Sequence, residues 1–251
     1  MTRTQVLLST PTPGTDTTQY SLLVAHEGAD VEAAQRLRHR VFAEEMGATL
    51  HTSRPGLDVD GFDELCDHLV VRHDPTGEIV GTYRMLPPGR ADRLYSDTEF
   101  DLSALADLRP ALVETGRSCV HPDHRSGAVV SLVWAGIARY MLLSGHSWLA
   151  GCASVPLADG GDLAAGVWRT VRAKHYAEEA HRVVPHTPWP APEPTGRPVV
   201  PPLLRGYLRL GAKVCGPPAL DVDFGVADFF VLLDLAGVDE RYLRFFLGDA
   251  R

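Results

Sequence analysis

The sequence has little of what marks a secreted or membrane protein. Its 251 residues include only four cysteines, and these lie far apart in a chain large enough to fold without disulfides. Residues 1–19 are rich in Thr and Pro, and their apolar run, Val6–Leu8, is too short for the core of a signal peptide. No apolar run approaches the ~20 residues that span a membrane. These absences predict a cytoplasmic protein with reduced thiols and a disordered N-terminal tail over residues 1–19.

Metal-ligand spacing is missing as well. Cys66 and His68 flank Asp67, but no second pair of ligands follows at the spacing of a zinc site. The acidic loop Asp58–Asp63 resembles a calcium loop in composition only, because it lacks the closing Glu and the ligand register of an EF-hand. We therefore expect no metal and no tightly bound cofactor.

Positive charge is scarce overall but concentrated in one segment. The net charge is −8, yet residues 165–215 contain eight Lys or Arg and three Glu. A basic segment on an acidic protein can dock an anionic partner, such as an acidic carrier protein, a membrane surface or a nucleic acid. The same charges can also form a solvated helix face. The residues considered for docking of a carrier protein are Arg169, Arg172, Lys174, Arg205, Arg209 and Lys213.

Helices and strands are mixed along the chain. Asp67–Arg72 and Ile79–Leu86 are predicted strands joined by the turn Asp74–Gly77. Ala111–Val120 is a predicted strand that leads into the apolar helix Ala128–Ser144. This mixture favours an α/β fold with a sheet of mixed direction. Further elements are expected at Tyr20–His26, Asp30–Met46, Trp148–Ser154, Asp162–Glu179, Pro201–Leu210, Val226–Leu235 and Asp239–Leu247.

One domain is expected over residues 20–251. Val183–Pro202 holds eight prolines, which exclude regular structure, so we expect an irregular loop within that domain.

The strand Ala111–Val120 carries the most informative charges. Glu114 and Arg117 lie three positions apart, so their side chains point to opposite faces of the strand unless a bulge re-aims one of them. Chemistry is often placed where a strand feeds the N-terminus of a helix, because that end attracts anions. The alternative is a structural ion pair. Other charged residues that could join this pair in one buried network are Arg38, Arg40, Asp58, Asp60, Asp63, Arg84 and Glu99.

A series of motifs in a fixed order resembles the ornithine-lipid N-acyltransferases, a branch of the GNAT superfamily with hemolysin-like members. The series comprises Arg40–Phe42, Glu45–Gly47, Asp60–Leu69, Gly81–Arg84, Glu114–Pro122, Trp134, Gly151–Ser154, Pro201–Tyr207 and Asp221–Gly225. The match covers roughly residues 20–247. A looser match to the acyl-homoserine-lactone synthases rests on Arg40, Phe42, Asp60, Asp63, Arg84, Phe100, Glu114 and Arg117.

The resemblance implies a fold and a reaction. The fold would be GNAT-like, with a mixed, mostly antiparallel central sheet flanked by helices and a cleft between splayed central strands. The reaction would move a long-chain fatty acyl group, with or without a 3-hydroxyl, from an acyl-carrier protein thioester to the α-amine of an amino acid, most simply ornithine. The expected partners are the carrier protein and the amino acid, with peripheral membrane contact left open and no nucleic acid.

Roles for individual residues follow the resemblance and the chemistry of amine attack on a thioester. We expect Glu114 to be the general base and Arg117 to lie near the developing oxyanion. Arg84 or Arg40 is expected to hold the carboxylate of the acceptor through a bidentate fork. The aromatic residues expected to contact substrate are Phe42 and Phe100.

Two further groups complete the expected site. Asp60 and Asp63 would either bind a second amine or brace the arginines, and bracing is favoured. The oxyanion and the acyl donor would be held by backbone N–H groups around Cys119, Val120 and His121, together with Arg125. Cys119 has no base beside it in the sequence pattern, which favours direct transfer over an acyl-enzyme.

The loop Arg125–Val130 departs from the phosphate loop of ordinary acetyltransferases. That loop reads Arg/Gln-x-x-Gly-x-Gly/Ala, whereas here one glycine is misplaced and the second is absent. The β-branched Val129 and Val130 would crowd a close approach of the backbone to two phosphates. The phosphopantetheine of a carrier protein offers only one phosphate, so the sequence favours acyl-carrier protein over acyl-coenzyme A, although coenzyme A binding through other contacts stays open.

The α-amine is the easier of two nucleophiles to use. An α-amino group titrates near ~8 and a side-chain amine near ~10.4, so deprotonation near neutral pH costs about 1–2 kcal/mol for the first and about 4–5 kcal/mol for the second. A carboxylate that acts through a water can suffice for the α-amine. The alternatives to this enzyme are a coenzyme A-dependent small-molecule acetyltransferase, a synthase of N-acyl amino acid or acyl-homoserine-lactone signals, and a non-catalytic GNAT-like binding protein.

Overall fold

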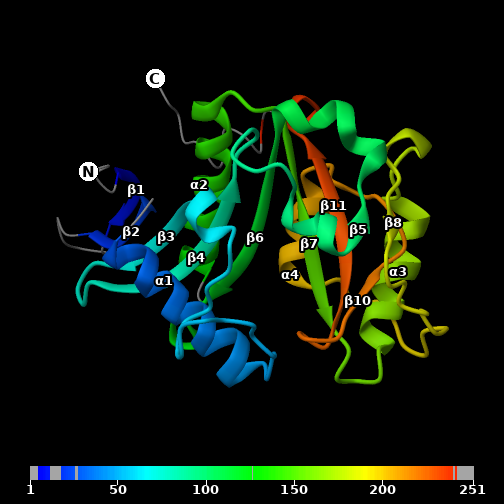
Figure 1. The fold of residues 1–251 in the computed structure, drawn as a ribbon, viewed down its shortest axis with the longest axis horizontal. Coiled ribbons are helices and arrows are strands. Elements are labelled where there is room, and N and C mark those ends of the chain that lie inside the picture. The colour runs from blue at the N-terminus through cyan, green and yellow to red at the C-terminus, as the bar shows by residue number, and fades with distance from the viewer. Residues whose placement is uncertain (1–4, 12–17, 26–27, 126, 240, 242–251) are drawn as a thin grey trace. The chain divides into compact units, whose positions relative to one another are not determined.

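In the computed structural model, residues 5–11, 18–25, 28–125, 127–239 and 241 are described (Figure 1). They divide into two compact units. Unit 1 draws on Met1–Arg90, Thr115–His146 and Glu240–Arg251, and unit 2 on Ala91–Glu114 and Ser147–Asp239. The expected single domain over residues 20–251 is therefore made of two units that interleave in sequence, and each is described by itself below.

The sheet of unit 1 is antiparallel over its first four strands. β1 (Gln5–Pro11), β2 (Thr18–Ala25), β3 (Asp67–His73) and β4 (Glu78–Leu86) pair in that order. The next strand is the second part of β6 (Leu112–Val120). The expectation of a disordered tail is wrong for β1, which pairs antiparallel with β2 from Gln5 to Pro11. The rest of residues 1–19 lies mostly outside the described part of the chain.

Two helices cover opposite faces of this sheet. α1 (Ala29–His39) continues as one π-helical turn at Arg40–Glu45, and α2 (Gly127–Ser144) follows β6. On β4, Gly81 lies against Val129 of α2, while Arg84, three residues later, points to the other face and joins a network with α1.

The length and composition of α2 bear on the expectation of no membrane-spanning segment. Gly127–Ser144 is long and apolar enough to cross a membrane, contrary to the expectation from the sequence, but half of that window is buried inside the protein. A core helix of a soluble protein meets the same criteria, and α2 packs on the sheet of unit 1 in that manner.

Unit 2 is built around a long antiparallel pair. β7 (Trp148–Pro156) and β11 (Val226–Asp234) match over nine positions, and β10 (Ala219–Asp221) pairs with the far side of β11. The first part of β6 pairs parallel with β7 over Leu112–Glu114 only. A two-stranded ribbon joins β5 (Phe100–Asp101) to β8 (Val184–Pro185), and β9 (Lys213–Val214) pairs with β11.

The helices of unit 2 are α3 (Asp162–Lys174) and α4 (Pro202–Arg209). α3 ends five residues before the expected Glu179 because the chain turns at His175 into a short bridge to Val214. Residues 183–201 are irregular apart from β8 and a bridge of Pro188 to Ala219, as their prolines predict, whereas Pro202 begins α4. The expected helix Asp239–Leu247 lies almost wholly outside the described residues. The core of unit 2 gathers Phe100, Leu102, Leu105, Leu112 and Phe230 among others.

Candidate active site

A buried network of arginines and aspartates lies in unit 1. Arg38 of α1 is fully buried and donates to both carboxylate oxygens of Asp63, at 2.8 and 2.7 Å. Its Nε lies 2.9 Å from Asp58 Oδ2, and its Nη2 also donates to the Asp58 carbonyl. Arg84 of β4 donates to Asp60 Oδ1 at 2.6 Å and to Asp63 Oδ1 at 3.2 Å. Arginines and aspartates thus alternate, so that each buried charge faces an opposite one.

Arg117 of β6 closes this network. Its Nε lies 3.3 Å from Asp58 Oδ2 and its Nη2 lies 3.4 Å from Asp60 Oδ2. Arg117 is the non-glycine residue with a positive φ in the described chain, 51°, a conformation that costs energy for a side chain with a Cβ. A positive φ at this position interrupts the regular alternation of side chains along the strand.

The network stabilises the ionised forms of Asp63 and Arg84. Burial raises the pKa of Asp63, but the hydrogen bonds and charge of Arg38 and the charge of Arg84 outweigh it and hold that pKa well below its usual range. Burial lowers the pKa of Arg84, and the charges of Asp60 and Asp63 more than reverse this. Asp60 and Asp63 therefore brace arginines, the option that the sequence analysis favoured.

The remaining expected residues of unit 1 lie apart from this network or inside the core. Arg40 is exposed, and its Nη1 lies 2.6 Å from Nε2 of His121. The His121 backbone N–H donates to the Val80 carbonyl at 2.8 Å, so it is not free to serve as an oxyanion donor, contrary to expectation. Arg125 forms a bidentate pair with Glu45 at 2.7 and 2.6 Å.

In unit 2, Glu114 is anchored by the backbone. It is 5% exposed, and its Oε2 and Oε1 accept hydrogen bonds from the N–H groups of Tyr95 and Ser96, at 2.6 and 2.8 Å. These donors belong to the 3-10 turn Tyr95–Thr98.

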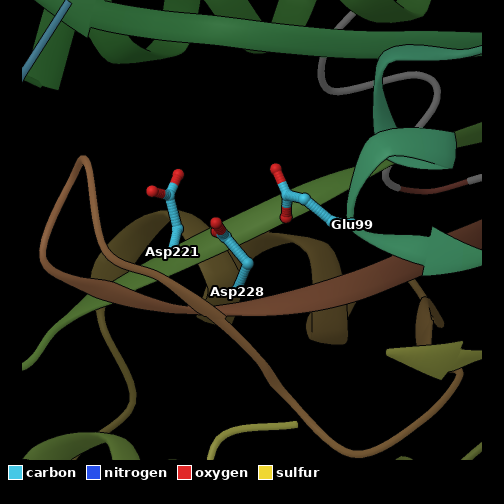
Figure 2. A group of neighbouring side chains, drawn as sticks. All are labelled: Glu99, Asp221 and Asp228. Atoms are coloured by element: carbon cyan, nitrogen blue, oxygen red, sulfur yellow. The ribbon is translucent and has the colours of Figure 1, made fainter. Parts of the chain in front are cut away.

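Three further carboxyl groups lie close together in unit 2. Glu99, Asp221 and Asp228 offer oxygens that all lie within 4.8 Å of one another. Figure 2 shows them on one side of the β10–β11 hairpin, with Glu99 arriving from the segment before β5. Asp228 Oδ1 accepts from the Ser154 hydroxyl at 2.6 Å, whereas the buried Glu99 Oε2 has no hydrogen-bond partner among the described residues. We call these three residues the acidic triad.

Glu99 in the acidic triad resists ionisation. Burial, and then the charges of Asp228 and Asp221, raise the pKa of Glu99 to about 9. The thiol of Cys152 lies between the triad and the base candidate: burial, then Glu99 and Asp228, and more weakly Glu114, raise its pKa well above the usual value. Its Sγ is 3.4 Å from Ser96 Oγ. A cation bound by the triad would relieve the repulsion between its carboxylates.

Neither candidate cysteine favours an acyl-enzyme. Burial raises the pKa of Cys119, which is 7% exposed, and the same holds for Cys152. A thiol of raised pKa carries little thiolate at neutral pH. The two aromatic residues expected to contact substrate are buried instead: Phe42 is 7% exposed, and Phe100 is 1% exposed with its ring 5.8 Å from that of Phe230.

The sequence alone did not suggest a role for several residues of these sites. Arg38 did carry a signal, because it shares the buried face of α1 with Val31 and Ala34, where a charge needs a partner. Glu99 was expected in a charged network and Asp221 stands in a motif of the resemblance, but no local pattern joins either residue to Asp228. The hairpin β10–β11 and the turn before β5 bring these residues together.

Comparison with known proteins agrees with this geometry. The fold and the sites define an acyltransferase of the GNAT class: residues 37–135 match the model of the acetyltransferase (GNAT) domain. The chain belongs to the family of L-ornithine N(alpha)-acyltransferases. It is 36% identical to the L-ornithine N(alpha)-acyltransferase of Brucella abortus, over 90% of this chain and 88% of the relative. The resemblance inferred from the motifs is confirmed.

Solved structures with this fold include two acyl-transferring synthases. The coenzyme A-dependent acyl-homoserine lactone synthase BjaI is 20% identical with a TM-score of 0.51, covering 88% of this chain and 84% of that one. FeeM, an N-acyl amino acid synthase from uncultured soil microbes, is 13% identical with a TM-score of 0.52, covering 86% and 92%. Such likeness concerns the fold, which is GNAT-like as expected. The chain is therefore an acyltransferase.

Proposed function

We propose that this enzyme transfers a long-chain acyl group from the thioester of an acyl-carrier protein to the α-amine of ornithine. The observation that carries the proposal is the anchored carboxylate of Glu114 in a chain that matches ornithine acyltransferases over nine-tenths of its length. The α-nitrogen attacks the thioester carbon, the C–N bond forms, and the C–S bond breaks. Glu114 takes the first ammonium proton directly or through a water and releases it to solvent; after attack the nitrogen loses a second proton, which passes to the departing thiolate.

The acidic triad gives the acceptor its second contact. Ornithine carries a side-chain ammonium besides the α-amine, and this charge needs an anionic partner when it leaves water. Asp60 and Asp63 already accept hydrogen bonds from Arg84, so they are poor candidates for binding the side-chain ammonium. Glu99 and Asp228 are better placed, because both they and Glu114 act on the thiol of Cys152 within unit 2. We assign the side-chain ammonium to the acidic triad.

A series of acceptors tests this assignment. Glu99→Gln and Asp228→Asn should raise the KM for ornithine at least about tenfold, the usual worth of a charged hydrogen bond. Norvaline lacks the second amine, so its poorer kcat/KM should change little in the same variants. Equal losses for both acceptors would show that the triad only supports the fold. Sensitivity of ornithine turnover to EDTA would instead assign the triad to a metal.

Two arginines of unit 1 are expected to hold the acceptor carboxylate, and their surroundings differ. Arg84 is 4% exposed and bonded to two aspartates, whereas Arg40 is exposed and contacts a histidine. Within unit 1, Arg40 is therefore the more accessible of the two arginines to a carboxylate ligand.

The start of α2 supports a carrier protein as the acyl donor. Arg125, the first residue of the loop, is held by Glu45, and Val130 in the first turn is 41% exposed where a phosphate loop has small residues. Because this turn offers a poor cradle for a pyrophosphate, acyl-carrier protein should give a higher kcat/KM than the matching acyl-coenzyme A. Equal efficiency would refute the donor assignment while leaving the acceptor assignment intact.

Docking of the carrier is assigned to the exposed end of α3. Arg172 and Lys174 are exposed there, and the carrier is acidic. The protein would act in the cytoplasm, close to the membrane that receives its lipid product.

A further inference from the structure

Unit 2 contains a basic pocket that the reaction does not use. The pocket has a volume of about 580 Å³ and lies between the C-terminal half of α3, the segment 197–200 and α4. Arg197, Arg205 and Arg209 line it, while Val199 and Leu208 supply apolar walls. We call it the arginine pocket. Its lining contains no acidic residue, although the protein as a whole carries a net charge of −8.

The arginines of this pocket differ from other exposed arginines of the chain. Arg36, Arg54 and Arg125 each pair with a glutamate at 2.6–2.9 Å. Within the described residues, no carboxylate pairs with the three arginines of the pocket. Arg205 Nη2 instead donates to the Val200 carbonyl at 2.6 Å, which directs its guanidinium along the pocket wall. Guanidinium groups that gather without carboxylates favour an anionic ligand, above all a phosphate.

Positive charge extends beyond the lining. His175 lines the pocket at the end of α3, and its pKa is lowered by burial and then by the charges of Lys213 and Lys174. These two lysines therefore lie near the same rim. An anion in the pocket meets a field of one sign, and the repulsion among these cations falls when it binds.

Exposed apolar side chains of the pocket lining and of α4 narrow the choice of ligand. Val199 is 55% exposed and Leu203, in the first turn of α4, is 36% exposed. Exposed aliphatic side chains beside arginines are typical of segments that lie in a membrane interface, where the aliphatic groups enter the acyl region and the cations meet anionic headgroups. The rim also holds prolines, which stiffen the segment without needing a sheet partner.

We propose that the arginine pocket binds the phosphate of an anionic phospholipid headgroup and docks the enzyme on the membrane surface through Val199 and Leu203. The pocket is concave and suits a single compact phosphate, whereas the acidic helix of a carrier protein presents an extended row of carboxylates. Docking would give an N-acylated product with a long aliphatic chain a direct route into the bilayer. That last step rests on the proposed function, but the lipid site itself does not.

Vesicle flotation tests the proposal. The full chain should float with phosphatidylcholine vesicles that contain about 30 mol% phosphatidylglycerol, and not with pure phosphatidylcholine. Arg205→Glu with Arg209→Glu should weaken binding at least about 30-fold, because each basic residue near the surface contributes about 1 kcal/mol and reversal more than removes it. The matched control is Arg36→Glu with Arg54→Glu, which makes the same change of net charge at exposed residues of unit 1 and should retain most of the binding.

Two further experiments distinguish a lipid headgroup from other anions and test the role of Val199 and Leu203. Soluble glycerol 3-phosphate should compete only weakly, since it lacks the membrane around the headgroup. Val199→Ser with Leu203→Ser should weaken flotation while leaving the salt dependence unchanged. A wild type that does not float, or pocket and control variants that lose binding equally, would overturn the proposal.

Enzyme assays without vesicles test whether the arginine pocket binds the carrier protein instead of a lipid. If Arg205→Glu with Arg209→Glu raises the KM for the carrier-bound donor and leaves flotation intact, the pocket is a carrier site and the lipid proposal is wrong. Turnover of soluble substrates is measured separately, so a failure of the proposed reaction would not be mistaken for a failure of lipid binding.

Discussion

Neutralising Asp63 should destabilise the protein far more than neutralising an exposed glutamate on the neighbouring helix. Asp63 is 4% exposed and accepts from Arg38 at 2.8 and 2.7 Å and from Arg84 at 3.2 Å. Asp63→Asn leaves these guanidinium groups buried with one carboxylate fewer. Removing one member of a buried ion pair costs about 3–5 kcal/mol. At about 2–4 °C per kcal/mol for a chain of this size, the thermal midpoint should fall by about 6–20 °C.

Circular dichroism and differential scanning calorimetry at neutral pH measure this shift, and Glu32→Gln is the control. Glu32 pairs with Arg36 and Arg54 on the surface, where solvent and salt screen the charges, so its loss should leave the midpoint nearly unchanged. The loss of stability at acid pH gives a second measurement. Because the folded pKa of Asp63 is lowered, its stabilisation is present above the ordinary value of 3.8 and is lost as pH falls below it. If both variants shift the midpoint equally, the network does not hold unit 1 together.

Three other outcomes test the sites. Glu114→Gln should cut turnover at least about 100-fold with an unchanged circular dichroism spectrum, the usual worth of a general base, and near-normal turnover would remove Glu114 from the mechanism. The raised pKa of Glu99 means that the folded state keeps a proton between about 4.5 and 9 that the unfolded state has lost, so stability falls as pH rises through this range. Glu99→Gln should flatten that fall in urea titrations across the range; an unchanged slope would contradict the assignment. Arg172→Glu with Lys174→Glu should raise the KM for acyl-carrier protein but not for a short acyl-pantetheine, and salt should act in the same direction. Equal effects on both donors would place carrier docking elsewhere.

Local patterns were enough for most elements and for the main charged residues. Alternating or continuous apolar runs located β3, β4, β6, β7 and β11 to within two residues, because burial imposes those periods on the sequence. The short strand β1 was missed, since its Thr- and Pro-rich composition resembles a tail and its stability comes from pairing with β2.

The sequence by itself determined that a charged strand leads into an apolar helix, that Glu114 and Arg117 stand on that strand, and that the aspartates of the acidic loop need cationic partners. Tertiary structure alone decided which partners they have. It placed Arg38 against Asp63 and Asp58, buried Phe100 in a core, and gathered Glu99, Asp221 and Asp228 from elements far apart in the chain. Helix and strand periods describe only which face a residue occupies, whereas a charged site depends on which faces meet, and that is set by the order in which strands pair.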